Sequence, residues 1–145
     1  MNIMNSLRSI LLLLLALVMF SVGHSTLLAQ SIQVRVLDAK SGARVPSEKV
    51  SVLIKGEKNA RDYTTDSEGN FSLQLDPSAA IYVATEWRIT CRRITPGVVP
   101  FVPVETILQE GFTVENTCGK AKSETIKGKL VIFTKKSSLL ENFKR

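Results

Sequence analysis

Thr64-Thr65-Asp66-Ser67-Glu68-Gly69-Asn70-Phe71-Ser72-Leu73 is the stretch of this chain that decides the fold. Its first half is a tight polar turn that contains a glycine, and its second half begins a strand in which apolar and polar residues alternate. The same combination occurs upstream, in residues 34–42. Such turns beside alternating strands are typical of an antiparallel β-sandwich. We therefore expect four structural turn residues, Asp38, Gly42, Asp66 and Gly69.

Alternation with a period of two continues through most of the chain, as expected of half-buried strands. The longest run extends from Ile81 to Cys91 and places Trp87 on its apolar face, which predicts a core position for this indole. Residues 130–134 are apolar on both faces and predict a strand that is central in its sheet. Together the pattern predicts an all-β fold, an antiparallel sandwich of about seven strands. The apolar faces of the other runs are Ile32, Val34 and Val36, then Val50, Val52 and Ile54, then Phe71, Leu73 and Leu75.

Two segments depart from this strand pattern. Residues 103–110 begin with a proline, carry apolar residues on one face and are followed by Gly111, which predicts one short helix within a long crossover. The tail, residues 137–143, has an apolar stripe that predicts one or two helical turns on the sandwich, or else a flexible end.

The amino terminus has the layout of a secretory signal peptide. A short region with one positive charge, Arg8, precedes an uninterrupted apolar run, residues 10–20, which is shorter than the ~20 residues of a membrane span. Cleavage after Ala29 is expected, with Ser25 as the competing position and an uncleaved anchor over residues 10–29 as the alternative. The chain thus divides into a leader, 1–29, and one domain, 30–145. We expect an exported protein, periplasmic, cell-surface or secreted, with no stable membrane span after leader cleavage.

Cys91 and Cys118 are the two cysteines, an even number in an oxidising compartment. A disulfide between them is expected, and it would stabilise the fold by about 3–4 kcal/mol on the chain-entropy estimate. Free thiols or an intermolecular bond are the alternatives.

The chain is basic, with 19 Lys and Arg against 13 Asp and Glu. Since only Arg8 is charged in the leader, the exported part would carry 18 − 13 = +5. A net positive charge is expected of a surface protein that binds polyanions, which is one alternative function. A solvated basic surface that keeps the protein soluble explains the same charge. No nucleic-acid partner is expected for an exported chain.

Histidine is missing from the predicted domain, because His24 is the only one and lies in the leader. This excludes Ser-His and Cys-His nucleophiles and histidine metal sites, so no catalytic residue, metal ligand or cofactor is predicted. A small hydrolase that uses carboxylates alone is the enzymatic alternative. Calcium at Asp62, Asp66 and Glu68 is disfavoured because their spacing is not that of a calcium loop. Tyr82 is the better candidate for an exposed aromatic residue.

Residues 38–46, 50–52 and 65–71 resemble the carboxypeptidase regulatory-like domain, whose pattern includes a Val-x-Val strand and a Thr-Asp-x-x-Gly-x-Phe hairpin. The likeness extends from Ile32 to about Val83. It departs from the family in two places: the first strand has Gln33 or Arg35 where the family often has glycine, and the family's proline usually lies nearer the Asp-Gly turn than Pro46 does. The second half, with residues 111–120 and 128–133, looks like the ending of small exported bacterial proteins that carry this domain alone. The resemblance implies an immunoglobulin-like, transthyretin-like sandwich that supplies no catalysis.

The function expected from the sequence is a non-catalytic module with a structural or binding role at the cell envelope. Its partner would be an envelope protein or a glycan, of unknown identity. The polyanion-binding protein and the carboxylate-dependent hydrolase are the competing functions.

Overall fold

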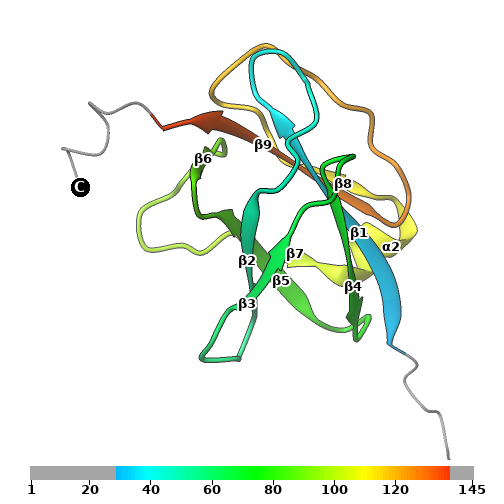
Figure 1. Cartoon of the computed structure of the whole chain (residues 1–145). Helices are drawn as coiled ribbons and strands as arrows, with labels where there is room; N and C mark the ends of the chain where they lie inside the picture. Colours follow the sequence, from blue (N-terminus) through cyan, green and yellow to red (C-terminus); the bar gives the residue numbers. More distant parts are fainter. Residues whose placement is uncertain (1–28, 138–145) are drawn as a thin grey trace, which may run out of the picture.

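The computed structural model describes residues 29–137, which form two packed β-sheets and one short helix (Figure 1). The all-β sandwich and the helix predicted near 103–110 are confirmed, the helix being α2 (Val104–Gln109). The predictions for the leader and the tail lie outside the described residues.

One sheet has the order β4-β1-β9-β6, with β8 also paired to β9, and the other has the order β3-β2-β5-β7. The five-stranded sheet contains β1 (Gln30–Asp38), β4 (Asn70–Leu75), β6 (Arg88–Thr90), β8 (Phe112–Thr113) and β9 (Lys129–Lys136), and the four-stranded sheet contains β2 (Lys49–Ile54), β3 (Arg61–Thr64), β5 (Ala80–Thr85) and β7 (Val102–Pro103).

The main core lies between the two sheets and is built from the alternating positions of their strands. Burial of each aliphatic or aromatic side chain there stabilises the fold by about 1.5–3 kcal/mol. Helix α2 contributes Val104 and Ile107 to the same core. The strand residues in it include Ile32, Val34 and Val36 of β1, Val50 and Val52 of β2, Phe71, Leu73 and Leu75 of β4, Ile81 and Val83 of β5, and Leu130 and Ile132 of β9.

Strand β9 is central in the five-stranded sheet and buried on both faces, as the sequence predicts. Leu130 and Ile132 face the main core, whereas Val131 and Phe133 belong to a second apolar cluster. However, β9 runs parallel to both β1 and β8, so this sheet is mixed rather than antiparallel. Parallel neighbours need a long crossover between them, and the whole chain between β1 and β9 serves as that crossover.

The turn at residues 66–70 is a corner between the two sheets. Its flanking strands β3 and β4 pair with β2 and β1 respectively, so the hairpin implied by the family resemblance is wrong. The Asp66 carboxylate accepts the N–H groups of Glu68 and Asn70 at 2.9 and 2.8 Å. Gly69 has φ 73°, and a Cβ there would lie 2.9 Å from the Val36 carbonyl oxygen. The corner therefore packs directly against the backbone of β1.

The run from Ile81 to Cys91 is not one strand, contrary to the sequence prediction. Strand β5 ends at Thr85 in the four-stranded sheet, and β6 begins at Arg88 in the other sheet. The change of sheet breaks the alternation, so Trp87 lies in the connection with 61% of its surface exposed. The predicted core position of Trp87 is therefore wrong.

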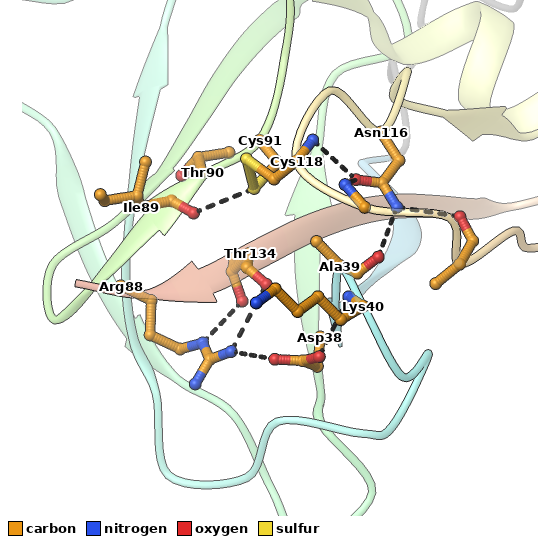
Figure 2. The surroundings of a disulfide bond; sticks show 12 residues. Asp38, Ala39, Lys40, Arg88, Ile89, Thr90, Cys91, Asn116, Cys118 and Thr134 are labelled. Atoms are coloured by element: carbon orange, nitrogen blue, oxygen red, sulfur yellow. Dashed lines mark hydrogen bonds and ion pairs between the residues drawn. A yellow bond between two sulfur atoms is a disulfide. The ribbon is translucent and has the colours of Figure 1, made fainter. Parts of the chain in front are cut away.

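The second apolar cluster lies on the face of the five-stranded sheet that is turned away from the main core. It contains the predicted Cys91–Cys118 disulfide, which the structure forms (Figure 2). Cys91 is thus buried in this second cluster and not in the main core between the sheets. The residues of the second cluster are Leu37, Ala39, Cys91, Val131 and Phe133, with Cys118 and Ala121 packed against them.

The segment after β8 covers this cluster and is fixed by Asn116 (Figure 2). The Asn116 side-chain amide donates to the carbonyl oxygens of Ala39 and Ala121, and its oxygen accepts the N–H groups of Cys118 and Gly119. One side chain thereby satisfies three backbone groups of a segment that has no regular strand partner and joins it to the Ala39 carbonyl just after β1.

Candidate functional site

Exposed apolar side chains are concentrated in one segment of the chain. Of the large apolar residues that the structure describes, five are exposed, and four of these lie between residues 87 and 99. We call these four the 87–99 surface; the exposed fractions are 61% for Trp87, 71% for Ile94, 58% for Val98 and 50% for Val99. Large apolar groups gathered at a surface are typical of interaction sites.

A buried carboxylate fixes the backbone that carries Trp87. Glu48 is only 4% exposed, and its Oε1 accepts the Trp87 N–H at 3.1 Å. Burial raises the pKa of Glu48. On the other side of the turn, the Thr85 hydroxyl donates to the Arg88 carbonyl oxygen at 2.8 Å. The exposed indole is therefore held on a backbone anchored from both sides.

Arg88 anchors the same turn to the five-stranded sheet (Figure 2). Its guanidinium donates to the Thr134 hydroxyl at 2.8 Å and to the Asp38 carboxylate at 2.5 Å. Asp38 also accepts N–H groups from Ser41 and Lys40, within the turn predicted from the sequence. The hydrogen bond from the Ser41 backbone is the largest cause that lowers the pKa of Asp38 to about 2, with further contributions from the Ser41 hydroxyl, Lys40 and Arg88.

The lowered pKa of Asp38 predicts acid sensitivity. Its carboxylate stabilises the fold above its ordinary pKa of 3.8, and this contribution disappears as the pH falls toward about 2. We expect Asp38→Asn to reduce the free energy of unfolding at neutral pH by about 1–3 kcal/mol, because Arg88 loses its charged partner. The variant should also show a flatter stability profile between pH 4 and 2, as measured by urea denaturation at each pH. Glu124→Gln, which removes one exposed charge elsewhere, is the control and should follow the wild-type profile.

A hollow of about 540 Å³ adjoins Trp87 and is lined by both apolar and polar groups. The Arg92 guanidinium lies over the Tyr82 ring at 4.5 Å from its centroid, a cation–π contact, and also donates to the Val83 carbonyl oxygen. Tyr82 is thus half-buried beneath Arg92. Ile94 forms another part of the wall, so the hollow joins two members of the 87–99 surface.

The distal part of the 87–99 surface is a tight turn. The Val98 N–H donates to the Thr95 carbonyl oxygen at 3.0 Å, with Pro96 and Gly97 between them and Gly97 at φ 76°. Proline followed by a glycine with positive φ is the sequence of a type II turn. The turn therefore presents Ile94 and Val98 from either side of a defined loop tip.

The carboxylates considered for calcium are occupied in separate contacts. Asp62 interacts with Ser51 and Lys49, Asp66 caps its own turn, and Glu68 pairs with Arg44. Between residues 29 and 137, no group of three or more His, Cys, Asp or Glu side chains is placed to hold a metal ion. Within the same residues, no helix has the length and apolar character needed to cross a membrane.

Comparison of the chain with protein-family models, with curated proteins and with solved structures finds no match.

Proposed function

We propose that this protein is an exported, non-catalytic binding module whose 87–99 surface docks on a protein of the cell envelope. The observation that carries the proposal is the exposed Trp87 on a turn fixed by the buried Glu48. A rigid backbone lowers the conformational entropy lost on binding, so a fixed tryptophan is well suited to anchor a partner.

The composition of the surface favours a protein partner. Tryptophan, tyrosine and arginine are enriched among the residues that dominate binding energy at protein interfaces, and Trp87, Tyr82 and Arg92 line one hollow. Ile94, Val98 and Val99 extend the apolar area beyond what a single stacked sugar ring needs. A glycan remains the second ligand class, because an exposed indole beside polar groups also suits a sugar face.

Three features support the exported and non-catalytic character. The leader pattern in residues 1–29 and the Cys91–Cys118 disulfide both favour an oxidising compartment. The likeness of residues 38–46 and 65–71 to the carboxypeptidase regulatory-like domain favours a module without catalysis.

Site-specific photo-crosslinking tests the proposal directly. A benzophenone amino acid at position 94, in protein expressed in its native cells, should give a discrete protein adduct. The same probe at Thr64, an exposed position on β3, is the control and should give none. Equal labelling from both positions, or no adduct at position 94, would contradict the proposal.

Trp87→Ala separates binding from folding in this experiment. Because the indole is exposed, the free energy of unfolding should change by less than about 0.5 kcal/mol. The adduct from position 94 should nevertheless fall at least about tenfold, because buried aromatic anchors contribute about 2 kcal/mol or more to an interface. Unchanged crosslinking, combined with tryptophan fluorescence changes on addition of envelope oligosaccharides to the wild type, would instead assign the surface to a glycan.

A further inference from the structure

We propose that β4 is the edge at which two copies of this chain pair, antiparallel, with Ser72 of one copy opposite Gln74 of the other. The proposal concerns self-association and is independent of the 87–99 surface, which lies in another part of the fold. It rests on the hydrogen-bond register of β4 and on the character of the sheet edges.

The register of β4 leaves two residues with their backbone groups directed outward. The Val36 N–H donates to the carbonyl oxygen of Gly69, the residue opposite it in the register. In an antiparallel pair, every second residue bonds to the neighbouring strand, so Phe71, Leu73 and Leu75 direct their backbone groups toward β1. The N–H and C=O groups of Ser72 and Gln74 therefore point away from β1. In the part of the chain that the structure describes, β4 pairs with no strand besides β1.

The strands at the other edges carry features that discourage pairing, whereas β4 does not. Strand β3 carries the charged residues Arg61 and Asp62, and β7 has two residues and ends in Pro103. Strand β8 has only two residues, and β6 has three and begins with Arg88. Short length, charge and proline are the usual means of blocking a sheet edge. Strand β4 has six residues, Asn70–Leu75, none of them charged and none a proline.

The outward backbone groups of Ser72 and Gln74 are complementary to the same groups of a second copy of the chain. In an antiparallel pair centred on Leu73, Ser72 of each copy lies opposite Gln74 of the other. Each of these two pairs can exchange both backbone hydrogen bonds, so every outward N–H and C=O of Ser72 and Gln74 gains a partner. The exposed Ser72 and Gln74 side chains then lie side by side, without any like charges opposed.

The dimer is expected to be weak. Leu73 is already buried in its own core, so pairing adds backbone hydrogen bonds but little apolar area. Interfaces of that kind lie at the small, transient end of the range. We expect a Kd between about 10 µM and 1 mM, to be measured by sedimentation velocity over that concentration range.

Amide hydrogen exchange provides the direct test of the register. In the purified protein, exchange at the Ser72 and Gln74 amides should slow as concentration rises from about 10 µM to 1 mM. The outward amides Asp62 and Thr64 on β3 are matched controls and should exchange at the same rate throughout. Protection of Ser72 and Gln74 that does not depend on concentration would mean that the same chain covers the edge. That result, or no protection at any concentration, overturns the proposal.

Proline substitution provides the second test. Gln74→Pro removes an N–H that points away from β1, a place where an edge strand tolerates proline. The change should raise the Kd at least about tenfold, because two intermolecular hydrogen bonds are lost and the ring obstructs the partner strand. Thr64→Pro makes the equivalent change on β3 and should leave the Kd unchanged. Equal effects of the two variants would overturn the proposal. If Gln74→Pro does not fold, amide hydrogen exchange of the wild-type protein tests the β4 pairing alone.

Discussion

Gly111→Ala is expected to lower the free energy of unfolding by about 3–5 kcal/mol. Gly111 follows the last turn of α2 with φ 84°, and its N–H donates to the Ile107 carbonyl oxygen. A Cβ at this position would lie 2.1 Å from the carbonyl oxygen of Ile126, a backbone atom. The variant therefore combines an unfavourable left-handed conformation with a clash that only displacement of the chain before β9 can relieve. Chemical denaturation measures the loss.

Gly97→Ala is the control that separates these two causes. Gly97 has a similar φ of 76°, but no atom lies within 4 Å of the position of the added Cβ. We expect a loss of about 1–2 kcal/mol from the left-handed conformation alone. If both variants were destabilised equally, the close packing of residue 126 against Gly111 would be contradicted.

Removal of the disulfide is expected to cost about 3–4 kcal/mol of unfolding free energy, because the bond closes a loop across 27 residues. The loss should appear in the Cys91→Ala, Cys118→Ala double variant and in reduced wild-type protein alike. The intact protein should have a mass two hydrogens below that of the reduced chain.

The position of the disulfide predicts which segment of the double cysteine variant opens first. Cys118 belongs to the segment that covers Val131 and Phe133 on the outer face of the five-stranded sheet. Without the bond this segment keeps the hydrogen bonds of Asn116 but loses its covalent attachment to Cys91. Trypsin should therefore cut first after Lys120 or Lys122, while β1 to β5 remain protected. First cleavage elsewhere, or two alkylatable thiols in the native protein, would contradict this account.

The sequence predicts those parts of the fold that depend on local patterns. The alternation in β1, β2 and β4 follows directly from side chains that point to opposite faces, and residues 130–134 are apolar throughout because both faces of β9 are covered. The position of α2 follows from Pro103 and Gly111. These signals lie within a few residues of the element that they specify.

Pairings between distant residues could not be predicted. The parallel register of β1 and β9 joins residues about 96 positions apart, from Gln33 to Lys129, and no local pattern encodes it. Trp87 continues the alternation of β5, so the sequence places it inside. It is exposed because Glu48, 39 residues earlier, accepts its N–H and because Arg88 pairs with Asp38. The candidate site was therefore missed, and the alternating pattern alone gave no signal for it.

The pairing of β1 with β9 also determines when the fold can be completed. Among the strands of residues 29–137, the ribosome synthesises β1 first and β9 last, and the centre of the five-stranded sheet cannot close before both exist. Long-range pairing of this kind is slow, because the chain must lose the entropy of a large loop before any contact compensates it. Until β9 has been synthesised this sheet therefore stays incomplete, and the chain lacks the compact fold that would block a narrow translocation pore during the export that we propose.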